Sequence, residues 1–307
     1  MPAITTPAGI TLEYETMGSP SEPAMLLVMG FGAQLIAWPR AFAERLAEAG
    51  RYVVLFDNRD CGLSSKLDGD PPDIPAILAA ASTGDIDKAK ALAPYTLSDM
   101  ARDGFALLSA LDIEQAHLVG ASMGGMIAQT MAIEHPERVL TLTSMMSNTG
   151  EPGFGEPTPE ASAALLTPSP PDRAGYVDAA ERSVIWRSRR YPELEAAREL
   201  AGQGYDRCYC PEGVTRQLAA MLASGPRADG LRDIRLPTLV LHGLDDTLIA
   251  PSGGERTAAL IPDAQLILIE DMGHDRPRAL WPQICEAILG HTATDTASSA
   301  PLSQSAA

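Results

Sequence analysis

The chain has 307 residues, of which 45% are hydrophobic and 21% charged. This composition is typical of a folded globular protein and excludes a disordered or fibrous one. Its 40 acidic and 23 basic residues give a net charge of −17, and because such a field repels phosphate backbones and anionic lipid surfaces, we expect no nucleic-acid partner.

The cysteines and the amino terminus indicate in which cellular compartment the protein is expected. Cys61, Cys208, Cys210 and Cys285 are too few and too scattered for a disulfide framework, and the single residue between Cys208 and Cys210 is not the spacing of a zinc site. The amino terminus has no basic stretch followed by an apolar run, and no run of 18 apolar residues occurs. We therefore expect a cytoplasmic protein with no metal site and no membrane span.

The first half of the chain alternates strand-like and helix-like segments. Strands are expected at 24–30, 51–57, 115–120 and 139–147, and helices at 39–50, 95–113 and 124–136. Thr96 and Asp99 have the spacing of a capping box, although Asp replaces the usual Glu or Gln. Residues 66–94 form an excursion punctuated by Pro, Gly and Asp. The alternation predicts an α/β fold whose sheet is mostly parallel and covered by helices on both faces.

The alternation stops at residue 151 and resumes at residue 238. Residues 151–237 begin with many prolines and glycines, continue as helix-like sequence, and contain 13 acidic and 11 basic residues. Strands then follow at 238–243 and 264–270, and helices at 252–260 and 281–289. The expected organisation is a core at 1–150 and 238–290, a helical insertion at 151–237, and a disordered tail of small polar residues at 291–307.

The strongest motif is G-x-S-x-G at 120–124, which directly follows a strand and directly precedes a helix. Such a turn is so sharp that Ser122 takes a strained conformation, and the residues two before and two after it must be glycine because a Cβ would clash. Ser122 is therefore the candidate nucleophile. Met123 opens the following helix, where an unpaired amide and the helix dipole favour a developing oxyanion.

A serine nucleophile needs a base, and the chain offers five histidines. His117 begins a strand, His135 ends a helix, His291 lies in the expected tail, and His242 lies inside a strand, where it is expected to be packed. His274 lies in a loop after the last strand, at the carboxyl edge of the sheet. We therefore expect His274 to be the base.

The third member of a triad is expected after the penultimate strand. Asp245 and Asp246 are adjacent there, and since successive residues point in different directions, only one is expected to face the histidine. We choose Asp246, three residues past Gly243. The second oxyanion donor is expected after the strand at 24–30, where the amide of Phe31 lies between two glycines.

These residues, together with MGFGAQ, FDNRDCGLSS and DMGHD, give the chain a resemblance to the α/β-hydrolase superfamily from about residue 9 to residue 290. More narrowly, these stretches look like a group of actinobacterial esterases that includes mycobacterial lipase/carboxylesterases and, more distantly, aclacinomycin methylesterase. The resemblance implies an eight-stranded mixed sheet, a helical lid at 151–237, and hydrolysis of small-molecule esters without a cofactor, by a monomer or homodimer. Met29 stands where many members have His. This difference does not affect the amide of Phe31, which is the expected backbone donor.

Several functions use the same machinery. The resemblance favours a serine carboxylesterase. Because the insertion is nearly neutral, we expect its substrates to be uncharged, fairly hydrophobic esters. A perhydrolase of the haloperoxidase type, a thioesterase and a carbon–carbon hydrolase would use the same triad. A catalytically silent ligand-binding member of the fold is the alternative that is not an enzyme.

Some side chains near the proposed site have two interpretations. Met29, Trp38, Met145 and Trp186 are candidates for substrate binding, although methionines at such spacing are also typical of a core. The cluster Arg187, Arg189 and Arg190 could line the lid or form a solvated helix face. Residues 57–59 are expected to tie a loop to its neighbours.

Overall fold

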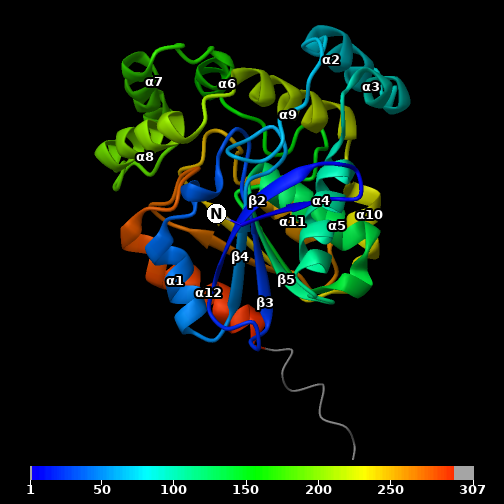
Figure 1. Ribbon diagram of the computed structural model, residues 1–307, viewed down its shortest axis with the longest axis vertical. Coiled ribbons are helices and arrows are strands. Elements are labelled where there is room, and N and C mark those ends of the chain that lie inside the picture. The colour runs from blue at the N-terminus through cyan, green and yellow to red at the C-terminus, as the bar shows by residue number, and fades with distance from the viewer. Residues whose placement is uncertain (1, 294–307) are drawn as a thin grey trace, which may run out of the picture.

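The computed structural model describes residues 2–293 and is built on one eight-stranded sheet (Figure 1). The strand order is β1-β2-β4-β3-β5-β6-β7-β8. Strand β2 is antiparallel to β1 and β4, and every other pairing is parallel. The strands are β1 (Ala3–Thr5), β2 (Thr11–Met17), β3 (Ala24–Val28), β4 (Tyr52–Phe56), β5 (Ala116–Ala121), β6 (Val139–Met145), β7 (Thr238–Gly243) and β8 (Gln265–Ile269). The predicted mostly parallel α/β sheet is confirmed.

Helices cover both faces of the sheet. One layer contains α1 (Arg40–Glu48) and α12 (Trp281–Thr292), and the other contains α4 (Leu97–Ala110), α5 (Met123–Glu134) and α11 (Ser252–Leu260). In β3, Met25 and Leu27 pack in the first layer, and Leu26 and Val28 pack in the second. Because successive side chains of a strand point to opposite faces, a strand between two layers must be apolar at every position. This explains the continuous apolar runs in the sequence.

The ends of the helices follow local signals. Asp99 accepts a hydrogen bond from the amide of Thr96 at 2.8 Å, and Thr96 Oγ1 accepts one from the amide of Asp99 at 3.4 Å. The capping box expected at the start of α4 is therefore present, with Asp in place of Glu. Three short 3-10 helices join larger elements: η1 (Leu35–Ala37), η2 (Pro136–Arg138) and η4 (Arg278–Leu280).

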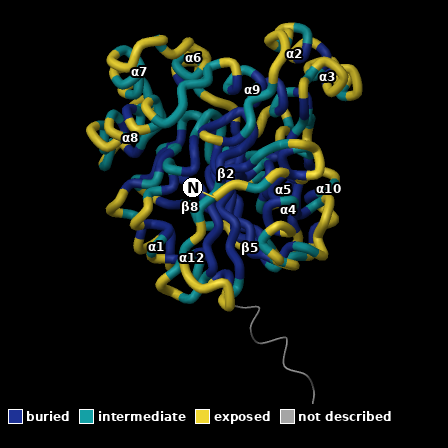
Figure 2. Tube along the Cα trace, in the orientation of Figure 1, coloured by how far each residue is buried: buried dark blue, intermediate teal, exposed yellow. Residues whose placement is uncertain are grey.

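Between β6 and β7 the described chain contains helices and no strand. These are α6 (Pro159–Leu166), α7 (Arg173–Ala179), the 3-10 helix η3 (Ala180–Ile185), α8 (Leu194–Arg207), α9 (Pro211–Ser224) and α10 (Ala228–Asp233). Helices α6 to α9 lie beyond one end of the sheet, with largely exposed outer surfaces (Figures 1 and 2). Helix α10 lies instead beside α5 and α11, and its Leu231 belongs to the same core cluster as Ile127. The last part of the insertion thus covers the sheet.

The excursion at 66–94 contains two helices that the sequence did not predict, α2 (Ile74–Ser82) and α3 (Ile86–Leu92). Asp73 and Asp85 cap their amino ends. Both helices pack against α9 through a small separate core of Ile77, Ala80, Ala89, Ala219 and Ala223. They lie next to α9 at the same end of the sheet (Figure 1).

Buried ion pairs join the loop after β4 to its surroundings. Arg207 of α8 donates to Asp57 at 2.6 Å, and Arg216 of α9 donates to both carboxylate oxygens of Asp60 at 2.9 and 3.0 Å. Arg59 donates to both oxygens of Asp103 on α4 at 2.6 and 2.8 Å. The loop therefore connects helices of the insertion to the core.

The turn from β5 into α5 packs against β3 with no space for side chains. A Cβ added at Gly124 would lie 2.0 Å from the carbonyl oxygen of Val28, and one at Gly120 would lie 2.1 Å from that of Gly124. A Cβ at Gly125 would lie 2.6 Å from Cβ of Ser147. Since real Cβ atoms do not approach other atoms so closely, these positions require glycine.

Helix α12 corrects the expected start of the tail. It continues to Thr292, and both His291 and Thr292 are buried. Thr292 Oγ1 accepts hydrogen bonds from Nε and Nη2 of Arg51 at 3.3 and 3.1 Å. The expectation of disorder from residue 291 is therefore wrong for these two residues. They belong to α12, and the small polar residues that follow them in the sequence hid this continuation of the helix. Residues 294–307 lie outside the described residues.

Breaking the Arg59–Asp103 pair should destabilise the protein far more than breaking an exposed pair. Arg59→Met leaves the buried Asp103 carboxylate without its partner, and we expect the free energy of unfolding in urea to fall by about 3–5 kcal/mol. The control is Arg173→Met, whose pair with Asp206 has 55% side-chain exposure on both sides and should contribute little to the free energy of unfolding. Equal losses in the two variants would contradict this account.

Adding one methyl group at the turn should also be costly. Gly124→Ala forces a Cβ against the carbonyl of Val28, so we expect a loss of several kcal/mol in urea unfolding, on the order of the larger overpacking costs. Gly290→Ala is the matched control because nothing lies within 4 Å of its Cβ position in α12. It should be neutral or stabilise the protein by up to about 1 kcal/mol. A neutral Gly124→Ala would refute the tight packing of the turn.

Candidate active site

Ser122 stands at the turn between β5 and α5 in a strained backbone conformation. Its φ and ψ are 58° and −124°, in a region that L-residues adopt only when surrounding contacts impose it. Its amide donates to the carbonyl of Met145 at 2.9 Å, and its own carbonyl accepts from the amide of Gly125 at 2.8 Å and from Ser147 Oγ at 2.9 Å. These contacts hold the strained residue in place.

The structure brings the three candidate triad residues together. Ser122 Oγ lies 2.9 Å from Nε2 of His274, and Nδ1 of His274 lies 2.7 Å from Oδ2 of Asp246. The other oxygen of Asp246 accepts from the amides of Leu248 and Ile249 at 2.9 and 2.8 Å. The carboxylate is thereby fixed toward the imidazole, and the imidazole toward the hydroxyl.

Asp246 remains ionised although only 3% of its surface is exposed. Burial alone would raise its pKa, but the electrostatic interaction with His274 and hydrogen bonds from His242 and His274 outweigh burial and lower the pKa to about 2. His242 is fully buried, with Nε2 at 2.8 Å from the carbonyl of Ile249 and 3.5 Å from Oδ2 of Asp246. The position of His242 inside a strand predicts only that it is packed, and the one sequence signal for this contact is its spacing of four residues from Asp246.

The neighbouring carboxylate points elsewhere. Asp245 accepts a hydrogen bond from the amide of Arg189 at 3.1 Å and lies 3.6 Å from its Nε. The two adjacent aspartates therefore diverge, one toward His274 and the other toward the helical insertion.

The other histidines have separate environments. Nδ1 of His117 lies 3.0 Å from Thr141 Oγ1, and burial, with smaller contributions from Arg51 and His291, lowers the pKa of His117 to about 4. His135 is half exposed beside Glu137. Of the five histidines, all within the described residues, His274 alone is hydrogen-bonded to Ser122.

The loop after β3 lies directly against Ser122. A Cβ added at Gly30 would lie 3.0 Å from Cβ of Ser122 and 3.5 Å from its Oγ. Phe31 follows Gly30, and Met123 is the first residue of α5. Within residues 2–293 neither the amide of Phe31 nor that of Met123 donates a hydrogen bond. Both candidate oxyanion donors are therefore unengaged near the hydroxyl.

The candidates for substrate binding separate into two groups. Met29, Trp38 and Met145 are buried in the core layer that contains α1 and α12, and Trp38 is stacked on Phe42 with ring centroids 5.8 Å apart. These three fit the alternative core interpretation. Trp186 is half-buried, and its carbonyl accepts a hydrogen bond from the amide of His274 at 2.6 Å.

Trp186 belongs to a segment, residues 185–190 and here named the strap, that contacts both loops of the site. Ser188 donates its amide to Asp275 at 3.0 Å, and Arg187 lies 3.3 Å from the same carboxylate. Arg190 pairs with Asp271 at 2.9 Å, and Thr247 Oγ1 donates to the carbonyl of Ile185 at 2.7 Å. The arginine cluster is therefore paired with aspartates that flank His274 and Asp246, which neither sequence interpretation anticipated.

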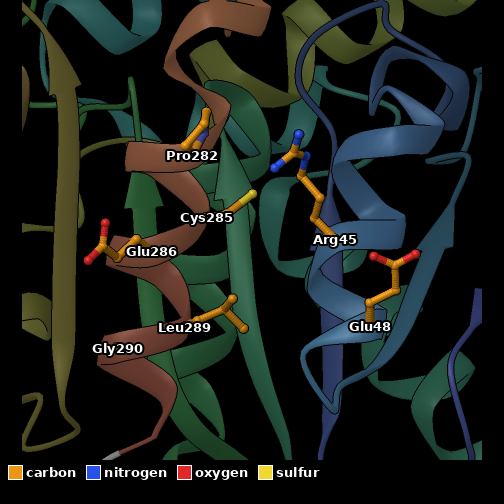
Figure 3. A pocket seen from close by; sticks show the side chains of 7 residues that line it. All are labelled: Arg45, Glu48, Pro282, Cys285, Glu286, Leu289 and Gly290. Atoms are coloured by element: carbon orange, nitrogen blue, oxygen red, sulfur yellow. The ribbon is translucent and has the colours of Figure 1, made fainter.

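A surface groove lies apart from these residues. It has a volume of about 640 Å³ and lies between α1 and α12 (Figure 3). Its lining consists of Arg45, Glu48, Pro282, Cys285, Glu286, Leu289 and Gly290. None of the candidate site residues contributes to it.

The described residues contain neither a cluster of metal ligands nor a helix that could span a membrane. Among residues 2–293, no group of three or more His, Cys, Asp or Glu side chains could hold a metal ion. None of the helices within that range combines the length and the apolar composition needed to cross a bilayer.

Comparison with known proteins identifies the family. Rhodomycin D methylesterase DauP of Streptomyces sp. (strain C5) is 29% identical over 310 residues, covering 94% of this chain and 96% of that protein. The putative carbamate hydrolase RutD of Variovorax paradoxus is 27% identical, covering 86% and 89%. A thermophilic esterase from Thermogutta terrifontis is 25% identical with a TM-score of 0.69, covering 95% of this chain and 98% of that structure.

The family model for the alpha/beta hydrolase fold matches residues 23–190, which span β3 to the strap. This match covers more than half of the chain, and the eight-stranded sheet agrees with it. The resemblance inferred from the G-x-S-x-G motif at 120–124 and the loop that carries His274 is therefore confirmed. The chain belongs to the alpha/beta hydrolase fold family.

Proposed function

We propose that the protein is a serine ester hydrolase in which Ser122 is the nucleophile, His274 the general base and Asp246 the group that orients the imidazole. The observation that carries this proposal is the continuous chain of hydrogen bonds, 2.9 Å from Ser122 to His274 and 2.7 Å from His274 to Asp246. These are the contacts that an activated serine requires. The methylesterase and esterase relatives support an ester as the substrate.

The proposed reaction proceeds through an acyl-enzyme. Ser122 Oγ attacks the ester carbonyl carbon while Nε2 of His274 takes the hydroxyl proton. The amides of Phe31 and Met123 donate to the oxyanion of the tetrahedral intermediate. Collapse of this intermediate breaks the ester bond, and the leaving alkoxide receives the proton from His274. Water then attacks the acyl group by the same route and releases the acid and Ser122.

The proposed substrates are small, uncharged and fairly hydrophobic esters. Residues 151–237 contain 13 acidic and 11 basic residues, and the three arginines of the strap pair with aspartates. These arginines are therefore engaged by the protein's own carboxylates and are poorly placed to recruit an anionic substrate. We also propose that α6 to α9, with α2 and α3, form a cap that limits which esters reach Ser122.

Two further parts of the proposal concern the cellular location of the protein and its need for a cofactor. All four cysteines are free thiols, which suits a reducing compartment, and we propose a cytoplasmic location. We propose catalysis without a cofactor because the three side chains and two amides suffice for each step of ester hydrolysis.

Removal of either reacting side chain should abolish turnover. We expect Ser122→Ala and His274→Ala to lower kcat for p-nitrophenyl butyrate by about 10⁴–10⁶-fold. Ser122→Ala should also end labelling by a fluorophosphonate probe. His135→Ala is the matched control because His135 is half exposed beside Glu137 and should retain wild-type kcat. Turnover by Ser122→Ala near the wild-type rate would refute the proposal.

The adjacent aspartates provide a second test. Asp246→Asn cannot fix the productive tautomer of His274, so we expect kcat to fall by about 10⁴-fold. Asp245→Asn removes the charge that faces Arg189, a side chain that is 77% exposed, but keeps an oxygen that can accept from its amide. Because such an ion pair is weak, kcat should stay within about threefold. Steady-state kinetics on both variants measure this difference. Comparable losses in the two variants would show that Asp246 has no special role.

A further inference from the structure

The loop that contains Phe31 is held by the helical insertion as well as by the sheet. The amide of Gly32 donates to Oε1 of Gln217 on α9 at 2.8 Å, and Nε2 of Gln217 donates to the carbonyl of Arg59 at 2.9 Å. Only 1% of the Gln217 surface is exposed. Because one end of its amide accepts and the other donates, the orientation of the side chain is fixed.

A second residue holds the far end of the same loop. Nε2 of Gln34 donates to the carbonyls of Gly204 and Cys208 at 2.8 and 3.0 Å. Its Oε1 accepts from Nη1 of Arg207 at 2.8 Å. Helices α8 and α9 of the insertion thus contact the loop at two points, four and six residues beyond the end of β3.

The conformation of the loop makes the Gln217 contact significant. The amide of Ala33 donates to the carbonyl of Gly30 at 3.3 Å, which closes a turn with Phe31 and Gly32 at its centre. Gly32 has φ of 64°, the conformation that a type II turn requires at its third residue. Type I and type II turns differ by rotation of the central peptide, the one that carries the Gly32 amide. Gln217 fixes that peptide.

We propose that Gln217 is a positioning residue that holds the turn so that the Phe31 amide faces the oxyanion. The inference rests on the proposed function of Ser122. The carbonyl of Gly30 shares a peptide plane with the Phe31 amide, and its bond to Ala33 holds only while the turn keeps its shape. Without Gln217, the Gly32 end of the turn loses its contact with α9. Because Gly32 has no Cβ, its backbone can then leave the turn conformation at little cost, which releases the Gly30 carbonyl from Ala33. The donor would then be aligned for only part of the time.

This role has a particular kinetic signature. An oxyanion donor acts on the tetrahedral state, so its misalignment lowers kcat with little change in KM. Complete loss of one such donor costs about 10²–10³-fold in kcat. Loosening the turn leaves the Phe31 amide in the chain, and we therefore expect a smaller loss of roughly 10–100-fold.

The test compares three substitutions on α9. Gln217→Leu removes both hydrogen bonds at nearly constant volume, and we expect kcat for p-nitrophenyl butyrate to fall 10–100-fold, with KM within about threefold. Affinity for a trifluoromethyl ketone, which forms a tetrahedral adduct, should fall by the same factor as kcat. Gln217→Glu keeps the acceptor for Gly32 but loses the donor to the Arg59 carbonyl, and should recover part of this loss. Arg216→Lys weakens the neighbouring anchor to Asp60 without touching Gly32 and should leave kcat and inhibitor affinity within threefold.

The outcomes separate this inference from the proposed function. If the wild-type protein hydrolyses no ester and resists fluorophosphonate labelling, the proposed function is wrong. If it is active but Gln217→Leu has wild-type kcat and inhibitor affinity, only the positioning role is overturned. A rise in KM shared by Gln217→Leu and Arg216→Lys, with kcat unchanged, would also overturn it and indicate general loosening of the cap. Should Gln217→Leu fail to fold, Gln217→Asn, one methylene too short to make both contacts, takes its place with the same expectations.

Discussion

The site depends on one backbone contact, the approach of Gly124 to the carbonyl oxygen of Val28. With only 2.0 Å between that oxygen and a Cβ position at Gly124, α5 can start directly against the end of β3. Ser122, two residues before Gly124, has its strained conformation with φ of 58°, and its hydroxyl lies beside Gly30. The same contact brings the first turn of α5 and the loop after β3 to one point, where both candidate oxyanion donors meet the proposed nucleophile.

The helical insertion does more than cover this point. It contacts three loops of the site. Gln217 contacts the loop after β3, Arg189 contacts Asp245 in the loop after β7, and the carbonyl of Trp186 contacts His274 in the loop after β8. Buried pairs of Arg207 with Asp57 and of Arg216 with Asp60 fix α8 and α9 over the core. Because a buried charge is costly without its partner, these pairs favour one docking position of the insertion over others. The geometry of the site is thus shared between the sheet and the helices above it.

Much of the fold and the candidate site could be predicted because their signals are local. Three signals each appear within a few consecutive residues: the glycines of the G-x-S-x-G motif, the buried runs of β3 to β7, and the loop that carries His274. Other features left no such signal. Strands β1 and β2 are short or only partly buried, and α2 and α3 are stabilised by packing against α9, more than 100 residues later in the chain. Gln217 lies 185 residues from Gly32, so nothing in either segment alone indicates their contact.

The most direct test of the account is to trap the covalent intermediate. The enzyme would be mixed with p-nitrophenyl butyrate, quenched in acid within milliseconds, digested and mapped by mass spectrometry. The account predicts one butyryl group on the peptide that contains Ser122, appearing as fast as the first equivalent of p-nitrophenol and disappearing once the substrate is consumed. An acyl group on a different residue, formed and lost at the rate of turnover, would contradict the central claim that Ser122 is the nucleophile.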